Sequence, residues 1–104
     1  MEFANKTVLI TGAATGIGRM TAKKLALLGS RVVIADLNGE KAEEAAKSIQ
    51  LEGGDAIGVR CDVTQDADVA ALIATVVATY GPVDVLINNR SESTRLNSSH
   101  NSNL

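Results

Sequence analysis

A single cysteine, Cys61, is all that this sequence of 104 residues contains, so no disulfide can form within the chain. The N-terminal stretch MEFANKTVLITG also lacks the charged, apolar and cleavable regions of a signal peptide. Both absences favour a reducing compartment, and we expect the cytoplasm. Cys61 itself is expected to pack as a small apolar residue at a strand end, the alternative being a reactive thiol.

The chain also lacks the features that bind nucleic acid, membranes or metals. Its 10 basic residues are scattered, the formal net charge is −2 and the pI is about 5.3, whereas electrostatic nucleic-acid binders are normally basic. No stretch approaches the roughly 20 apolar residues of a membrane span. The one histidine, His100, makes neither a catalytic triad nor a metal site by itself. We therefore predict no nucleic acid, membrane or metal as a partner.

The composition changes sharply at residue 90. Apolar residues make up 45% of the whole chain, which is typical of one small globular domain. Residues 90–104, RSESTRLNSSHNSNL, hold five serines and three asparagines but only two apolar residues. Such a stretch buries too little surface to offset its ordering entropy, roughly 1–2 kcal/mol per residue. We predict an incomplete domain over 1–89 and, over 90–104, a disordered tail of non-native sequence, such as adapter read-through or a frameshift.

Apolar runs alternate with helical patterns through the predicted domain. Strands are predicted over 7–11, 31–36, 56–61 and 83–88, and helices over 16–28, 39–51 and about 69–80. The predicted apolar stripes are Ile17, Met20, Thr21, Leu25 and Leu28; Ala42, Ala45, Ala46 and Ile49; and Val69, Leu72, Ile73, Val76, Val77 and Tyr80. Helices between strands favour parallel pairing, so we expect an α/β fold with a partial doubly wound parallel sheet, βαβαβαβ.

The stretch TGAATGIG, Thr11–Gly18, joins the first predicted strand to the first predicted helix. Ligands of open parallel sheets bind beyond the carboxyl ends of the strands, and a helix N-terminus attracts phosphate. In this reading Gly12 permits the turn, Gly16 lets backbone N–H groups approach a pyrophosphate, and Gly18 lets the helix pack against the sheet. The spacing G-x-x-x-G-x-G favours a dinucleotide site, and the alternative is a turn without a ligand.

Asp36 ends the second predicted strand, 18 residues after Gly18. A carboxylate there can accept hydrogen bonds from both ribose hydroxyls of an adenosine and would repel a 2′-phosphate. Thr15, between the glycines, offers no positive charge to balance such a phosphate. The pattern therefore favours NAD(H) over NADP(H). The alternative is that Asp36 caps the following turn, Asp-Leu-Asn-Gly.

Residues 5–89 resemble the N-terminal half of a short-chain dehydrogenase/reductase. The resemblance rests on TGAATGIG, Asp36, Cys61-Asp62-Val63 and the stretch VDVLINN over 83–89, in that order. It implies a Rossmann-type fold that binds a nicotinamide dinucleotide for hydride transfer to or from an alcohol or carbonyl. The cofactor-binding candidates are Gly12, Ala14, Thr15, Gly16, Ile17, Gly18, Asp36, Asp62, Val63 and Asn89.

The resemblance also implies roles for the later candidates. Asp62 would accept a hydrogen bond from the adenine amino group, with Val63 beside the ring. Asn89 would lie near the adenosine ribose, and Asn88 would tie the fourth strand to the sheet. The alternatives are that Asp62 caps a turn before the third helix and that both asparagines merely end a strand.

The resemblance stops where the family has Asn-Asn-Ala-Gly and this chain has Asn88-Asn89-Arg90-Ser91. The family's catalytic serine, Tyr-x-x-x-Lys pair and helical asparagine come later. Tyr80, the sole tyrosine, is followed four residues on by Asp84 rather than lysine, and a carboxylate would raise the pKa of a phenol. We expect Tyr80 to be a core residue and predict no catalytic residue.

Three functions are compatible with this pattern. The first is a cofactor-binding fragment of an oxidoreductase that is inactive alone, and the second is a non-catalytic module that binds or senses a dinucleotide. The third, a methyltransferase-like nucleotide binder, is disfavoured by Thr11, Asp62 and Asn88-Asn89. Full-length relatives are expected to be homo-oligomers.

Overall fold

The computed structural model describes residues 3–89, which contain seven helices and strands. Their order is β1 (Thr7–Thr11), α1 (Gly16–Leu27), β2 (Arg31–Asp36), α2 (Gly39–Leu51), β3 (Asp55–Arg60), α3 (Asp66–Tyr80) and β4 (Val85–Asn88). β1, β2 and α2 have the predicted bounds, whereas β3 lies one residue earlier and β4 begins two residues later than predicted. The predicted tail, 90–104, lies outside the described residues.

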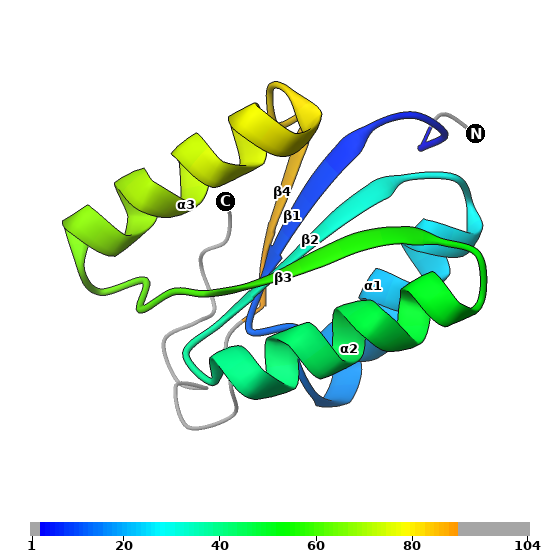
Figure 1. Cartoon of the computed structure of the whole chain (residues 1–104), viewed down its shortest axis with the longest axis horizontal. Helices are drawn as coiled ribbons and strands as arrows, with labels where there is room; N and C mark the ends of the chain where they lie inside the picture. Colours follow the sequence, from blue (N-terminus) through cyan, green and yellow to red (C-terminus); the bar gives the residue numbers. More distant parts are fainter. Residues whose placement is uncertain (1–2, 90–104) are drawn as a thin grey trace.

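The strands form one parallel sheet in the order β3-β2-β1-β4 (Figure 1). Leu9, at the centre of β1, is in register with Val33 of β2 and Leu86 of β4. Helices α1 and α2 cover one face of the sheet, and α3 lies on the other (Figure 1). The predicted fold class, α/β with a doubly wound parallel sheet, is therefore confirmed.

The core beneath α2 is built from small residues on the helix and β-branched residues on the sheet. All four predicted inner residues of α2 are buried: Ala42, Ala45, Ala46 and Ile49. They pack in one cluster with Val8, Ile10, Val32 and Ile34. The helix lies so close to β3 that a Cβ at Gly58 would overlap the backbone carbonyl of Ala42. Close packing therefore explains why alanines form this stripe.

The predicted stripe of α1 is wrong in most of its members. Ile17 and Met20 are 76% and 58% exposed, and Leu28 lies just past the helix end with 54% of its surface exposed. The buried face consists of Gly18, Ala22, Leu25 and Ala26, of which only Leu25 was predicted. The smallest residues face inward because the N-terminal half of α1 passes close to the loop that precedes it. Apolar size therefore pointed to the wrong face.

Helix α3 covers a second, smaller core on the opposite face. Leu72 and Val76 are buried against Leu9, Val33, Ala35 and Cys61. The rest of the predicted stripe is less covered, since Ile73 is 40% exposed and Val77 50%. Within residues 3–89, α3 is the one helix on this face (Figure 1), and Leu86 of β4, in register with Leu9, is 48% exposed. No helix in this part of the chain is both long and apolar enough to cross a membrane.

Candidate dinucleotide site

The candidate site residues follow the carboxyl ends of all four strands. The glycine loop follows β1, Asp36 ends β2, Asp62 comes two residues after β3, and Asn89 follows β4. Parallel strands bring these ends to one edge of the sheet. The chain also passes from β3, at one side of the sheet, to β4 beside β1, and such a switch point is where doubly wound sheets bind ligands. The fold therefore gathers the candidates at one edge.

Gly12 makes the turn out of β1, as predicted. Its φ is +65°, which disfavours residues with a side chain, and its N–H donates to the carbonyl of Ala35 at 2.8 Å. A Cβ at this position would overlap the backbone carbonyl oxygen of Asn89. The turn is thus confined between the ends of β2 and β4.

Gly18 has a different role from the predicted one. An added Cβ would lie 2.6 Å from the carbonyl oxygen of Gly12 and 2.7 Å from Nδ2 of Asn89. That Nδ2 donates a hydrogen bond of 2.9 Å to the same carbonyl. Gly18 therefore lets α1 pack against the turn and Asn89 rather than against the sheet. The link between Asn89 and Gly12 was not foreseen from the sequence.

Gly16 faces open space at the start of α1. Its φ is +63°, and an added Cβ would meet nothing within 4 Å. Thr15 is the N-cap residue without a side-chain capping hydrogen bond, and the first turn of α1 contains no acidic residue. No carboxylate within the first turn of α1 therefore offsets the partial positive charge of this helix end, and the residues present fit a phosphate group. Ile17, the residue after Gly16, is 76% exposed.

Asp36 joins the end of β2 to the glycine loop. Its Oδ2 accepts a hydrogen bond from the backbone N–H of Ala14 at 3.1 Å, and its Oδ1 accepts one from the N–H of Asn38 at 3.0 Å. The second contact is the turn-capping interaction considered as the alternative. An ionised carboxylate has about four acceptor positions, so both contacts leave capacity for a ligand.

Asp62 also caps a turn. Its Oδ1 accepts hydrogen bonds from the backbone N–H and the hydroxyl of Thr64, at 3.0 and 2.6 Å. These two bonds hold the pKa of Asp62 below its usual value, so the side chain is an ionised acceptor at neutral pH. Both use Oδ1, and capping therefore does not occupy Oδ2. Val63, beside it, is 53% exposed.

Two carboxylates, whose role the sequence analysis missed, accept hydrogen bonds from backbone N–H groups and hold segments of the sheet and its loops together. Asp84 accepts a hydrogen bond from the N–H of Thr7 at 2.8 Å, at the start of β1. Asp68 accepts one from the N–H of Asp62 at 3.0 Å, in the loop after β3. Asp68 lies in the first turn of α3, and an acid in a first helical turn was the one sequence feature that could have indicated its role. The predicted tie by Asn88 is present, since its Oδ1 accepts from the hydroxyl of Thr11 at 2.8 Å.

Tyr80 lies away from the glycine loop, at the other end of the sheet. Its hydroxyl donates to Asp55 at 2.7 Å, and the guanidinium of Arg31 lies 6.0 Å from the ring centroid. Burial, followed by the Asp55 carboxylate, raises the pKa of Tyr80. The direction is the predicted one, but the carboxylate is Asp55 and not Asp84. The ring packs against the α3 core, which fits the predicted role in packing.

Cys61 is 2% exposed and belongs to the core beneath α3. Burial, reinforced by Asp68 and Asp62, raises the pKa of its thiol. Both observations match a small apolar residue rather than a reactive thiol. Within residues 3–89, no three His, Cys, Asp or Glu side chains are grouped to hold a metal ion.

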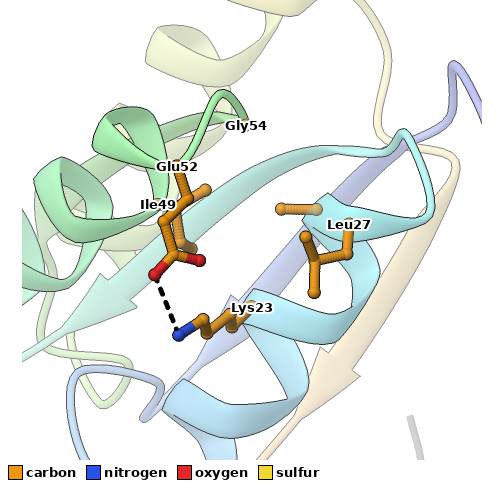
Figure 2. Close-up of a pocket in the computed structure, with 6 residues that line it drawn as sticks. Lys23, Leu27, Ile49, Glu52 and Gly54 are labelled. Atoms are coloured by element: carbon orange, nitrogen blue, oxygen red, sulfur yellow. Dashed lines mark ion pairs between the residues drawn. The ribbon is translucent and has the colours of Figure 1, made fainter.

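A small hollow lies between the C-terminal ends of α1 and α2 (Figure 2). Leu27 and Ile49 line it, and Lys23 pairs with Glu52 across its opening at 3.1 Å (Figure 2). Its cavity volume of about 10 Å³ has room for about one water molecule. The hollow is therefore too small for a nucleotide, and the candidate site remains the edge that carries the glycine loop.

A glycine loop at a helix N-terminus, with an acid ending the neighbouring strand, defines a dinucleotide-binding type of fold. The short chain dehydrogenase family model matches residues 6–103, and the chain belongs to this family. Members of the family carry out oxidoreduction with a nicotinamide dinucleotide, NAD or NADP.

Named relatives support this assignment. The 7alpha-hydroxysteroid dehydrogenase of Escherichia coli K12 is 39% identical over 89 residues, which are 86% of this chain and 35% of that protein. The short-chain dehydrogenase/reductase homolog YusS of Bacillus subtilis is 39% identical over 92 residues, 88% of this chain and 84% of that protein. A crystal structure of hydroxysteroid dehydrogenase from Escherichia coli superposes with a TM-score of 0.83 at 37% identity, covering 86% of this chain and 38% of the other. The chain thus spans about a third of the length of the 7alpha-hydroxysteroid dehydrogenase and of other curated relatives that it matches.

Proposed function

We propose that this chain is the NAD(H)-binding portion of a short-chain dehydrogenase/reductase and binds the adenosine diphosphate half of the dinucleotide. The open space in front of Gly16 at the N-terminus of α1 carries this proposal most directly. Backbone N–H groups at that helix end would hold the pyrophosphate, which a side chain at position 16 would keep away. The bound dinucleotide would supply the hydride-transfer chemistry of the family.

Asp36 favours NAD(H) over NADP(H). Its carboxylate ends β2 beside the glycine loop and keeps acceptor capacity for the two ribose hydroxyls. A 2′-phosphate at the same place would meet this negative charge with no basic residue in the glycine loop to balance it. At the other end of the adenosine, Asp62 would accept from the adenine amino group, with Val63 against the ring. Asn89, already bonded to Gly12, would border the ribose.

We further propose that the chain binds the cofactor without catalysing hydride transfer. Tyr80, its one tyrosine, donates to Asp55 and lies at the opposite end of the sheet from the glycine loop. A second candidate is a non-catalytic module that binds or senses the dinucleotide. The coverage of YusS favours it, because this chain matches 84% of that relative, so a family member of comparable length exists.

Calorimetric titration with NADH, NADPH and adenosine diphosphoribose tests the cofactor proposal. Asp36→Asn removes the charge but keeps an oxygen that can accept from Ala14, and Glu40→Gln is the matched control in the first turn of α2. We expect Asp36→Asn to shift the NADH-to-NADPH affinity ratio toward NADPH by at least about fivefold, because a nearby charge repulsion is lost. Glu40→Gln should leave the ratio unchanged. An unchanged ratio in Asp36→Asn contradicts the assignment of Asp36.

An alcohol-oxidation assay, followed as NADH formation at 340 nm, tests the absence of catalysis. We expect no turnover with the wild-type chain. Turnover that Tyr80→Phe abolishes would overturn the structural role given to Tyr80. If the wild-type chain binds neither dinucleotide nor adenosine diphosphoribose while folded, the proposed function is wrong.

A further inference from the structure

The carboxylate of Asp68 links the first turn of α3 to the end of β3. Its Oδ2 accepts two hydrogen bonds, one from the backbone N–H of Asp62 at 3.0 Å and one from Nη1 of Arg60 at 2.8 Å. The Asp68 side chain is 29% exposed, so the contact with Asp62 lies partly away from water. One oxygen atom therefore holds both the strand end and the loop that follows it.

Backbone N–H groups at several positions hold the loop between β3 and α3 in place. Cys61 donates its N–H to the carbonyl of Asp36 at 2.9 Å, which ties the start of the loop to β2. Gln65 donates its N–H to the carbonyl of Asp62 at 2.9 Å, which closes the turn. Between them, the backbone N–H of Asp62 depends on Asp68 for its acceptor. Asp68 is thus the side chain on α3 that sets where Asp62 lies.

Arg60 is itself held in place. Its Cα is the register partner of Asp36 on β2, and a Cβ at Gly39 would lie 2.8 Å from the Arg60 Cβ. The stem of Arg60 therefore packs against the start of α2, while its guanidinium pairs with Asp68. This packing limits the directions that the guanidinium can take, and the pair holds the Asp68 carboxylate toward the loop.

We propose that Asp68, held by Arg60, is a positioning residue for recognition of the adenine ring. The proposal rests on the proposed function, in which Asp62 accepts from the adenine amino group. Asp68 does not touch the ligand. It fixes the backbone of Asp62, and with it the direction of the Asp62 carboxylate and the adjacent surface of Val63. Without the Asp68 carboxylate, the N–H of Asp62 loses its acceptor, and the orientation of Asp62 and Val63 toward the adenine is no longer fixed.

A comparison of two dinucleotides tests the proposal on the full chain. NADH carries the adenine amino group, whereas reduced nicotinamide hypoxanthine dinucleotide has a carbonyl at that position. We expect the wild-type chain to bind NADH more tightly, and Asp68→Ala to reduce this preference by about two- to tenfold, the worth of one hydrogen bond. Asp66→Ala is the matched control, since it removes the other acid in the first turn of α3. It should leave the preference unchanged.

Two further variants separate positioning from a loss of folding. Asp68→Asn keeps an oxygen that can accept from the N–H of Asp62, so it should restore most of the preference. Arg60→Gln leaves α3 intact and should lower the preference in the same direction by a smaller factor, because a half-exposed ion pair contributes little. Circular dichroism checks that each variant is folded. If Asp68→Ala does not fold, the NADH preference of the folded Arg60→Gln variant tests the proposal, and an unchanged preference contradicts it.

The outcomes distinguish this inference from the proposed function. If the wild-type chain prefers NADH and the folded Asp68→Ala variant keeps the full preference, Asp68 has no positioning role and the proposed function stands. If the wild-type chain binds both dinucleotides equally, the assignment of Asp62 is wrong and the inference goes with it. If the wild-type chain binds neither, the proposed function itself is refuted.

Discussion

Replacing Gly18 by alanine should destabilise the protein strongly, although alanine favours helices. The added methyl group would lie 2.6 Å from the Gly12 carbonyl oxygen, 2.7 Å from Nδ2 of Asn89 and 2.9 Å from the Ala13 Cα. Two of these atoms belong to the backbone, and the third is held in a hydrogen bond. None is the free end of a flexible side chain. To make room, α1 must move away from the turn and the Asn89 side chain must move as well, which breaks its link to Gly12.

The magnitude follows from those two costs. Overpacking a tight site costs about 1–3 kcal/mol. Losing the hydrogen bond from Asn89 to Gly12 adds about 0.5–1.5 kcal/mol. We therefore expect Gly18→Ala to lower the free energy of unfolding by about 2–4 kcal/mol, a large part of the 5–15 kcal/mol typical of small domains.

Gly16→Ala is the matched comparison in the same loop. Its methyl group would enter open space, so the cost is the left-handed backbone conformation alone, about 1–2 kcal/mol. The same methyl group would stand in front of the helix N-terminus, where the pyrophosphate is proposed to lie. Gly16→Ala should therefore weaken NADH binding more than its small loss of stability explains.

Urea unfolding, followed by circular dichroism because the chain has no tryptophan, measures the first effect. With a slope of about 1–3 kcal/mol per molar urea, the Gly18→Ala midpoint should fall by roughly 0.7–4 M. Calorimetric titration with NADH measures the second effect. If Gly18→Ala is as stable as Gly16→Ala, the close packing of α1 on the turn is not what excludes a side chain at position 18, and the reasoning fails.

Three further predictions concern groups outside the glycine loop. The fold favours the neutral form of Tyr80, so the stability that Tyr80 contributes is present below the unfolded pKa near 10 and is lost as the pH rises through the raised folded pKa. Absorbance at 295 nm should show no phenolate at pH 10 until urea unfolds the chain. An ordinary titration midpoint near 10 in the folded chain would contradict this prediction. Cys61, buried and with a raised thiol pKa, should resist iodoacetamide at pH 8 until the protein unfolds, and rapid native labelling would show that the strand end opens. Asp84→Ala leaves the partly buried N–H of Thr7 without its acceptor and should cost about 1–3 kcal/mol in urea unfolding, a loss that Asp84→Asn should partly restore.

The elements best predicted from the sequence are those decided by a local pattern. β1 and β2 are continuous apolar runs with abrupt polar or glycine ends, and burial on both faces of a parallel sheet favours that composition. Helix α2 carries a stripe of alanines at helical spacing, and all the predicted inner residues are buried. In both cases the short-range pattern and the tertiary environment agree.

Helix α1 shows where the local pattern fails. A reading by apolar size places Ile17 and Met20 inside, whereas the structure buries Gly18 and Ala22. The deciding quantity is the distance between helix and loop, which allows only the smallest residues at the contact. That distance depends on the conformation of the turn at Gly12 and on Asn89, 71 residues beyond Gly18 in the chain. Hydrophobic periodicity contains no information about it.

The candidate site was predictable in outline for a topological reason. Once the strands are known to be parallel, the residues after each strand must meet at one edge of the sheet, and this places Asp36, Asp62 and Asn89 near the glycine loop. Their hydrogen bonds were not predictable, because each links segments that are distant in sequence. The exceptions are the contacts of Asp36 with Asn38 and of Asp62 with Thr64, since capping a short turn is a local interaction.

Three side-chain contacts to the backbone assemble the edge of the sheet. Asp36 accepts from the loop at Ala14, Asn89 donates to the loop at Gly12, and Asp68 accepts from Asp62. Each contact reaches from one segment at this edge to the backbone of another, and the contacts of Asp36 and Asn89 form when β2 and β4 are paired with β1. Much of the ordering that a dinucleotide would otherwise impose is thus already present in the folded chain. A ligand that binds only this folded form stabilises it in proportion to the logarithm of its concentration above Kd. Sheet pairing and cofactor affinity should therefore change together in this protein, even for substitutions that touch no ligand atom.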